Sequence, residues 1–577
     1  MSAPSPCPDF LATSGLPDRW LGRERWVVLD IGTGAIDRFA ALLAAWRADP
    51  QRVGRWMVLA LDGPDSADFD AGRVQWMRLP GNTNDPEPAL RGLQAQVDTF
   101  VLDKHVVLTP DLLRRLNRLA APGATLVTPR TEAVVREGLV RNGFVVDAAE
   151  TRCTQARFAP RFTLPQPAAF RPQHQGPREA LVIGGGLAGC AAAWALARQG
   201  WATTVLDRQA APAQETSGNP GGLMHGTFNA PDGLHARWFR AASLLTARLA
   251  RPAIASGAVA GDLRGFVRLE HRIDAAQAAA QLARVGLPDN YVRWISADEA
   301  RWRTGLPVES GGWFYAQAGW LSPGDWSRWL LAQAVSAGLA RFQGQIAVDA
   351  LRRSPAGRWQ VLDGGGRVLA EAPVVVLANA NAVDHLLTPH AAATAMQPVR
   401  GQTTLLAADT PELHPPRQAL SGQGYGLTLL DGRVLIGATS QPDDLDTAVR
   451  LSDHLRNLER AAQLGLCPVD LAHGDGLAAA TGRVGWRATT PNRLPLIGPP
   501  LDRSACDAAR RGGRMRLDAL RHLPRCQGAD HGLFVFTGLG SRGITSAALG
   551  AQMLAAWITG APFPVEAALR DALDPAR

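Results

Sequence analysis

Three glycines and one aspartate at fixed spacing carry the clearest chemistry in the sequence. Gly184, Gly186 and Gly189 follow a short apolar run in the register G-x-G-x-x-G. Asp207 ends the next strand-like run, residues 203–206. In this pattern the glycines permit a tight turn, close approach to a pyrophosphate and close packing of helix on strand, and the acid accepts from a ribose hydroxyl. The combination predicts a dinucleotide-binding unit, although the turn alone would suit any glycine-rich loop.

A glycine-rich loop at residues 216–226 follows this motif. It contains Ser217, Gly218 and Asn219. Glycine and asparagine tolerate unusual backbone angles and allow close approach to a planar ring or a phosphate. The position of the loop beyond the ribose acid favours a cofactor contact over an ordinary surface loop.

A second glycine turn lies between the apolar run 533–537 and a helix predicted to begin near Ile544. The backbone N–H groups of this turn and the positive end of the helix dipole would face a ligand bound over the turn. Because a reduced flavin carries negative charge at its pyrimidine edge, such a turn would stabilise it. The candidate cofactor contacts here are Gly538, Gly540, Ser541 and Gly543.

These loops need a sheet that holds them together, and the sequence predicts an α/β domain over residues 179–577. The runs 347–351 and 372–380 are predicted to return the chain to the nucleotide-binding sheet. The segments 398–402 and 431–437 suit an antiparallel substrate subdomain inserted into that sheet, within about residues 230–475.

Tryptophans gather between residues 230 and 330. They could stack on nucleic-acid bases, but most are expected in the core, where tryptophan buries well against a sheet. They are Trp238, Trp294, Trp302, Trp313, Trp320, Trp326 and Trp329.

Residues 1–160 are predicted to form a separate Rossmann-like unit. The buried-strand pattern from Arg25 runs into the turn Asp30-Ile-Gly-Thr-Gly34, and a second strand-like run ends at Asp62. In a nucleotide-binding sheet such a turn cradles S-adenosylmethionine, and the later acid holds its ribose. The alternative is any α/β domain with a short glycine turn.

The rest of this unit fits the order of a small methyltransferase-like domain. A strand is predicted at 97–102, followed by Asp103, and helices are predicted at 109–119 and 131–142. Residues 161–178 contain several prolines and few periodic apolar residues, which is typical of a linker.

The composition limits the classes of protein to which this chain can belong. The chain has 577 residues, 46% of them hydrophobic, and a net charge of +8. No run of 18 or more apolar residues and no signal-peptide pattern is present, so we expect a cytoplasmic protein without a membrane partner. The six cysteines form no C-x-x-C pair, so we expect reduced thiols and no metal site. The diffuse positive charge only slightly favours RNA.

Taken in order, the motifs resemble the FAD-dependent amino-acid oxidase superfamily. More narrowly, residues 179–565 resemble the oxidase half of the bifunctional tRNA enzymes that make 5-methylaminomethyl-2-thiouridine at the wobble position, and segment 15–34 resembles the start of their methyltransferase half. The resemblance implies FAD as cofactor, tRNA as partner and a monomer. It also implies oxidative removal of the carboxymethyl group from carboxymethylaminomethyl-uridine, followed by methylation of the exposed amine from S-adenosylmethionine.

Such a substrate presents a carboxylate, which a planar guanidinium binds bidentately. By resemblance to glycine-type oxidases, Arg487 and Arg542 match the positions that hold it. We therefore predict these two as the catalytic residues, against the alternative of surface or sheet-edge arginines.

The methyltransferase half departs from the family pattern. The family's G-x-G-x-G-x-N-F becomes Gly32-Thr-Gly-Ala-Ile-Asp-Arg-Phe39, in which the third glycine is replaced by Ala or Ile and the asparagine by Asp or Arg. Of a later D-G-F-A-P loop only Asp103 remains, and the stretch between Asp62 and Asp103 is several dozen residues short. Methyl transfer is therefore expected to be lost or weakened, with the unit kept as a scaffold or tRNA-docking surface.

Two other functions stay open at this point. An oxidase of small glycine- or sarcosine-like amines would not need the N-terminal unit. A tRNA-binding module that keeps the flavin fold as a relic would bind tRNA but be colourless when purified.

Overall fold

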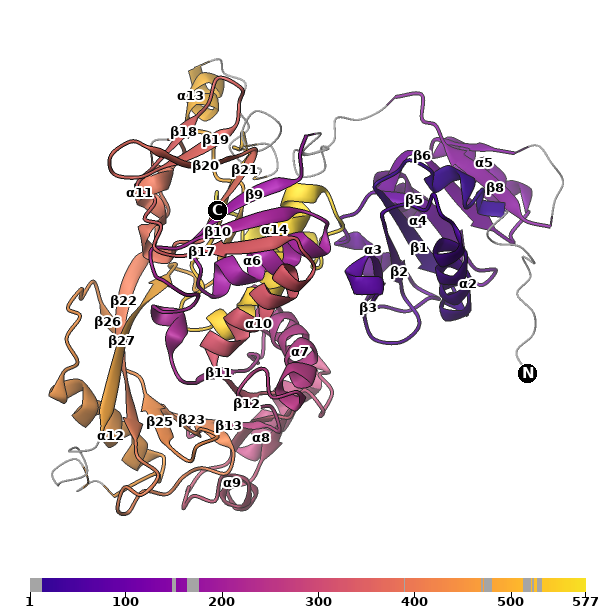
Figure 1. Cartoon of the computed structure of the whole chain (residues 1–577). Helices are drawn as coiled ribbons and strands as arrows, with labels where there is room; N and C mark the ends of the chain where they lie inside the picture. Colours follow the sequence, from indigo (N-terminus) through magenta and orange to yellow (C-terminus); the bar gives the residue numbers. More distant parts are fainter. Residues whose placement is uncertain are drawn as a thin grey trace. The chain divides into compact units, whose positions relative to one another are not determined.

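The computed structural model describes residues 13–147, 152–162, 176–388, 390–468, 471, 480–511, 520, 523–526 and 532–577 (Figure 1). By its contacts the chain divides into two compact units. One comprises Met1–Pro172 with Thr559–Ala568, and the other comprises Gln173–Ile558 with Leu569–Arg577. Most of the predicted linker, residues 163–175, lies outside the described residues.

The N-terminal unit is built on an eight-stranded sheet in the order β3-β4-β2-β1-β5-β6-β8-β7. Strands β4, β2, β1, β5 and β6 are parallel, and β3, β8 and β7 pair antiparallel at the edges. Its elements are β1 (Arg25–Ile31), α2 (Ala35–Ala48), β2 (Arg55–Ala60), β3 (Ala67–Phe69), β4 (Val74–Arg78), α3 (Glu87–Arg91), β5 (Val97–Leu102), α4 (Pro110–Leu119), β6 (Ala120–Thr128), α5 (Ala133–Arg141), β7 (Phe144–Val146) and β8 (Thr154–Phe158).

Helices cover both faces of this sheet because its central strands are apolar on both faces. Val28 of β1 packs with α2 on one face, whereas Val27 and Leu29 pack with α3, α4 and α5 on the other. The predicted helix at 109–119 is confirmed as α4, whose N-cap Thr109 accepts a 3.0 Å hydrogen bond from the Leu112 N–H. That bond satisfies one of the N–H groups left free at a helix start.

The second unit contains a six-stranded sheet in the order β17-β10-β9-β21-β29-β28, parallel except for β28. Helix α6 packs against α10 and contacts this sheet (Figure 1). The elements are β9 (Glu179–Ile183), α6 (Leu187–Arg198), β10 (Ala202–Leu206), α10 (Pro323–Ser336), β17 (Ala340–Gln343), β21 (Val374–Leu377), β28 (Leu496–Gly498), β29 (Leu533–Thr537) and α14 (Gly543–Thr559).

One strand that was predicted to join the nucleotide-binding sheet belongs to another sheet. The run 347–351 overlaps β18 (Ala350–Arg353), which joins a separate three-stranded sheet with β19 (Trp359–Leu362) and β20 (Val368–Ala372). The strand that joins the nucleotide-binding sheet there is β17. As an edge strand it has no fully buried residue, so it lacks the apolar signature of its neighbours.

A nine-stranded sheet lies in sequence between β10 and β29. Its order is β14-β15-β13-β23-β24-β25-β22-β26, with β27 also paired to β22. Most of its pairs are antiparallel, and β22 pairs with β27 along nine positions. The strands are β13 (Phe266–Leu269), β14 (Val292–Ile295), β15 (Gly312–Tyr315), β22 (Gln397–Leu406), β23 (Ala419–Ser421), β24 (Tyr425–Thr428), β25 (Val434–Gly437), β26 (Gln441–Pro442) and β27 (Thr481–Thr489).

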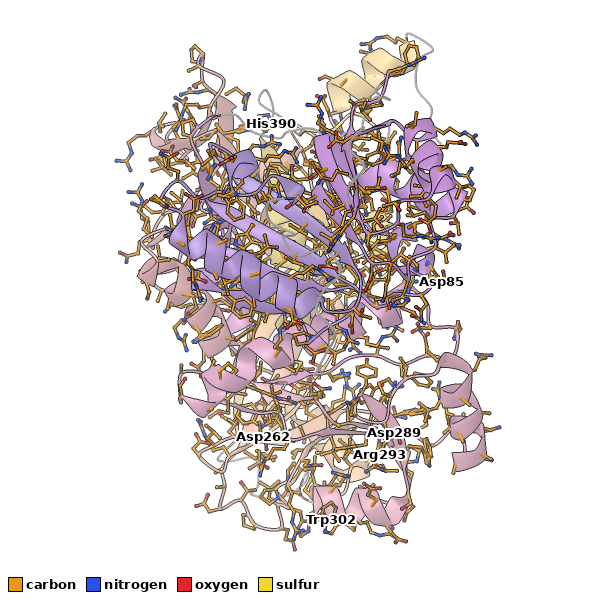
Figure 2. The ribbon with its side chains drawn as sticks, turned by 90° about the vertical axis from the view of Figure 1, so that its right-hand side faces the viewer. Asp85, Asp262, Asp289, Arg293, Trp302 and His390 are labelled. Atoms are coloured by element: carbon orange, nitrogen blue, oxygen red, sulfur yellow. The ribbon has the colours of Figure 1, made fainter. Side chains whose placement is uncertain are left out.

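The tryptophan-rich stretch is mostly core, as predicted. Trp238, Trp313 and Trp326 are buried, whereas Trp302 on α9 (Ala297–Thr304) is 66% exposed and lies at the edge of the view in Figure 2. Among the described residues, no helix combines the length and apolar character needed to cross a membrane.

The cysteines only partly match the prediction of reduced thiols. Four are free and buried: Cys190, Cys467, Cys506 and Cys526. Cys153 is disulfide-bonded. Such a pair is decided by proximity in the fold, which the spacing of cysteines along the chain does not show.

Candidate active site

A cavity of about 340 Å³ brings the two glycine turns and both predicted arginines together. It lies within the second unit, at the carboxyl ends of the parallel strands, where ligands of open α/β sheets bind. Nine predicted residues line it: Gly186, Ser217, Asn219, Arg487, Gly538, Gly540, Ser541, Arg542 and Gly543. The other four, Gly184, Gly189, Asp207 and Gly218, lie outside its lining.

The first turn requires its glycines for steric reasons. A Cβ on Gly184, whose φ is +107°, would lie 2.6 Å from the Ala378 carbonyl oxygen, and a Cβ on Gly189 would lie 1.7 Å from the carbonyl oxygen of Gly184. Gly186 is the N-cap of α6 and lies close to Ser217. The turn therefore brings bare backbone and the start of α6 to the cavity, which is the arrangement that a pyrophosphate needs.

Asp207 follows β10 and points back at this turn. Its Oδ2 accepts a 2.5 Å hydrogen bond from the Gly185 N–H, and its Oδ1 accepts one of 2.7 Å from the Gln209 N–H. The carboxylate therefore holds the turn from the side on which the ribose of a dinucleotide would lie.

The loop after the first motif is tied to both sides of the cavity. The Ser217 Oγ accepts a 3.1 Å hydrogen bond from the Leu187 N–H at the start of α6. The Thr216 hydroxyl donates to the carbonyl of Trp486 and accepts from its N–H, both at 3.1 Å. These bonds join the loop to β27 directly beside Arg487.

The second glycine turn leads into α14. Gly538 and Gly540 have φ values of +70° and +55°, which favour glycine, and α14 begins at Gly543, one residue from the predicted start. The turn and the N-terminus of α14 line the cavity, so the helix dipole favours negative charge there.

Arg542 is the most informative side chain in the cavity. Burial lowers its pKa to about 10, so it remains charged at neutral pH. Its guanidinium lies 4.8 Å from the ring centroid of Phe239, and its buried Nη1 has no hydrogen-bond partner among the described residues. A buried guanidinium with a free donor is costly unless an anion satisfies it.

Arg487, on β27, is the second cavity arginine. Its Nη1 donates a 3.1 Å hydrogen bond to the Thr439 carbonyl, and burial lowers its pKa. Thr439 is held in turn, because its hydroxyl accepts a 2.9 Å hydrogen bond from the Gln402 N–H on β22. The guanidinium of Arg487 is therefore oriented from the neighbouring sheet strand.

The chain contains only three tyrosines, and all three lie near these arginines. Tyr425 neighbours Arg487 and lines the cavity, and burial raises its pKa to about 12. Tyr315 and Tyr291 neighbour Arg542, with ring centroids 5.9 Å apart in an edge-to-face contact. Their rarity in the sequence is a signal that points to them, whereas no spacing motif includes them.

His225, in the loop 216–226, is a further cavity residue that was not among the predicted site residues. Its ring stacks on Phe266, with centroids 4.4 Å apart, and its Nδ1 lies 2.6 Å from the Gly226 carbonyl oxygen. Burial, and then the charge of Arg542, lowers its pKa well below the usual value. The imidazole is therefore neutral, with Nδ1 as donor and Nε2 as an acceptor that makes no hydrogen bond within the described part of the chain.

The glycine turns, the orphaned guanidinium and the dipole of α14 define the class of this protein. It matches the FAD dependent oxidoreductase family over residues 179–557. Its fold is that of glycine oxidase from Bacillus cereus (TM-score 0.51, 21% identity, 68% of this chain and 97% of that one) and of L-proline dehydrogenase from P. horikoshii (TM-score 0.51, 15% identity, 70% and 97%). The chain is a FAD-dependent oxidoreductase with a glycine-oxidase-like α/β domain.

Full-length relatives narrow the family further. The chain is 44% identical to the tRNA 5-methylaminomethyl-2-thiouridine biosynthesis bifunctional protein MnmC of Methylibium petroleiphilum, over 98% of this chain and 92% of that protein. It is 36% identical to the protein of the same name from Cupriavidus necator, with the same coverage. The chain therefore belongs to the MnmC family. The first alignment runs over 621 residues, more than the chain contains, so it includes residues of the relative that have no counterpart here.

Proposed function

We propose that this chain modifies the wobble uridine of tRNA by oxidising its 5-carboxymethylaminomethyl group to aminomethyl, with release of glyoxylate. Family membership supports the tRNA substrate, because the relatives are named for biosynthesis of a modified tRNA uridine. The observation that carries the chemistry is the buried Nη1 of Arg542, which has no hydrogen-bond partner among the residues that the structure describes, in a cavity shared with Arg487.

The two arginines bind the substrate carboxylate. A guanidinium forms two parallel hydrogen bonds with a carboxylate, and the free Nη1 of Arg542 provides a donor for one of them. Arg487 is oriented by Thr439 and adds a second positive charge to the cavity. Together they hold the methylene carbon, between carboxylate and amine, in one position.

The same charges set the protonation state of the substrate amine. With two guanidinium groups facing one carboxylate, a protonated amine would add another unbalanced charge to a buried site. The amine is therefore bound neutral, and Nε2 of His225, which lines the cavity, would accept from its N–H. FAD, when bound, supplies the hydride acceptor, and the substrate imine left behind hydrolyses to the primary amine and glyoxylate.

The residues that hold FAD in this proposal are those of the two turns and the loop between them. Gly184 and Gly189 shape the first turn, Gly186 brings α6 to the pyrophosphate, and Asp207 meets the ribose. Ser217, Gly218 and Asn219 form the contacting loop. Gly538, Gly540, Ser541 and Gly543 place the N-terminus of α14 at the flavin.

The remaining sheets have roles that follow from their architecture. The nine-stranded sheet, which carries Arg487 and Tyr425, is the substrate subdomain. In the N-terminal unit, the parallel strands β4-β2-β1-β5-β6 follow the 3-2-1-4-5 order of a doubly wound nucleotide-binding sheet. That order supports a methyltransferase-type fold. A monomer that works on tRNA in the cytoplasm, without a metal, completes the proposal.

The test is an aerobic incubation of the purified flavoprotein with tRNA that carries 5-carboxymethylaminomethyl-uridine. Mass spectrometry of the wobble nucleoside should show loss of the carboxymethyl group, together with formation of glyoxylate. Unchanged tRNA, combined with turnover of free N-alkyl glycines, would replace the proposal with an oxidase of small amines.

A further inference from the structure

The N-terminal sheet has one place where a nucleotide cofactor would bind. The strand order reverses between β1 and β5, and ligands of such sheets bind at the carboxyl ends of the strands at that reversal. The turn from Gly32 to Gly34 follows β1 there, and Asp103 follows β5. A family named for a bifunctional enzyme implies S-adenosylmethionine at this position.

A side chain of the protein already fills this turn. Arg38, on the first turns of α2, folds back onto the carboxylate of Asp30 at the end of β1. Its Nε lies 2.7 Å from Oδ2 and its Nη2 lies 2.6 Å from Oδ1. The pair is withdrawn from solvent, with side-chain exposures of 15% for Arg38 and 3% for Asp30.

The guanidinium also lies against both glycines of the turn. A Cβ on Gly32 would be 3.0 Å from the Arg38 Nη2, and a Cβ on Gly34 would be 3.7 Å from its Nη1. The backbone surface that a cofactor would approach through these glycines is therefore covered by Arg38.

A second set of hydrogen bonds engages Asp103, which lies beside the same turn. The Oδ2 of Asp103 accepts from the N–H and the hydroxyl of Thr33, at 3.1 and 2.8 Å. Its Oδ1 accepts from the Lys104 N–H at 2.6 Å. Asp30 and Asp103 are thus engaged within the protein, whereas exposed Asp62, after β2, accepts a 2.8 Å hydrogen bond from the Gly63 N–H.

The positive charge of Arg38 opposes binding of the cofactor in addition to the space that its side chain fills. S-adenosylmethionine carries a sulfonium and an ammonium group, and it needs carboxylates as partners at this site. Arg38 presents a permanent positive charge and uses both oxygens of Asp30. The cofactor would have to displace a buried, bidentate pair and leave Asp30 or Arg38 without its partner, which is strongly unfavourable.

We propose that Arg38 is a resident plug of the N-terminal nucleotide site, so that this chain binds no S-adenosylmethionine. If the proposed function holds, the chain then releases aminomethyl-uridine rather than methylaminomethyl-uridine. An N-methyl group on that amine would have to come from a separate N-methyltransferase.

The test is calorimetric titration of the full-length flavoprotein with S-adenosylmethionine. We expect no binding to the wild type and recovered binding in Arg38→Asn, which removes the charge and shortens the side chain. Arg38→Gln keeps the Asp30 carboxylate and offers it an amide donor, and it serves if Arg38→Asn fails to fold. The matched control is Arg47→Asn, since Arg47 lies on the same helix but pairs with Asp70 at the surface.

Each outcome decides the proposal. Binding of S-adenosylmethionine by the wild type at the micromolar level would overturn it. Absence of binding in the wild type and in both folded variants would overturn the role of Arg38 as the plug. In a parallel assay with tRNA and S-adenosylmethionine, aminomethyl-uridine as the end product supports the proposal and methylaminomethyl-uridine contradicts it. Unreacted tRNA would count against the proposed oxidase function and leave the calorimetric result intact.

Discussion

Arg400 and Asp453 form an ion pair that is sealed from solvent, with 2.6 Å between Nη1 and Oδ2 and side-chain exposures of 0% and 1%. Arg400 also donates to the carbonyls of Asp446 and Ala448 and to the side chain of Gln441. The pair therefore anchors the segment between β25 and α12 (Leu451–Gln463) to β22. That segment includes the Thr439 carbonyl that orients Arg487.

Asp453→Asn should destabilise the second unit. Replacing the acid leaves a buried guanidinium without its counter-charge, which costs about 3–5 kcal/mol in comparable buried pairs. Thermal unfolding, followed by flavin fluorescence, should show a clearly lower Tm. The control is Asp431→Asn, whose partner Arg433 is about half exposed, and which should change stability by less than about 1 kcal/mol. Equal shifts in the two variants would contradict the structural role of the Arg400 pair.

Arg542→Gln should impair substrate binding while retaining the flavin. It removes a buried, charge-assisted contact to the carboxylate, worth about 1.5–3 kcal/mol, so kcat/KM on tRNA should fall by roughly 10- to 150-fold. Arg542→Lys should recover only part of this loss, because an ammonium lacks the planar fork. Arg367→Gln, which removes an exposed arginine paired with Asp363, is the control. Unchanged kcat/KM in Arg542→Gln would argue against carboxylate recognition by this residue.

Gly189→Ala should abolish stable FAD binding. A Cβ at this position would lie 1.7 Å from the carbonyl oxygen of Gly184, so the first turn and α6 would have to move apart. The ratio of flavin to protein absorbance after purification measures the loss. Gly364→Ala is the matched control, because no atom lies within 4 Å of the added methyl group. A full flavin complement in Gly189→Ala would contradict the assigned role of this turn.

Acidification should destabilise the second unit partly through His225. Its folded pKa lies below the unfolded value of about 6.5, so the unfolded chain binds the additional proton as pH falls below that value. Stability is then lost with decreasing pH, by up to about 1.4 kcal/mol per pH unit, and is unaffected by this group above pH 7. Tm should fall less in His225→Gln than in the wild type between pH 7.5 and 5.5. An identical fall would mean that His225 titrates normally.

Much of the fold followed from local patterns. The strand 97–102 was predicted with the bounds that β5 has, and the helix predicted near Ile544 begins at Gly543. Central parallel strands are recognisable because both of their faces are buried. The edge strand β17 escaped prediction because none of its residues is fully buried.

Only the site residues that belong to a sequence motif could be predicted. Arg487 and Arg542 were identified by resemblance, and the structure brings both to one cavity. His225 and Tyr425 belong to no spacing pattern. His225 directly follows β11 (Gly222–Met224) and Tyr425 begins β24, and these strands are far apart in the sequence. Asp207 was predicted for the ribose, and its contact with Gly185 became evident only in the fold.

The sequence by itself determined the dinucleotide turns and the α/β character, because glycine spacing and apolar periodicity are local properties of the chain, and the resemblance of its motifs to a known family indicated the family. Only the tertiary structure decided which charged side chains have hydrogen-bond or ion-pair partners. Within the described part of the second unit it left Nη1 of Arg542 without a hydrogen-bond partner, and in the N-terminal unit it placed Arg38 on Asp30. The physical reason is that hydrogen-bond satisfaction and burial depend on distances between residues that the sequence order does not specify.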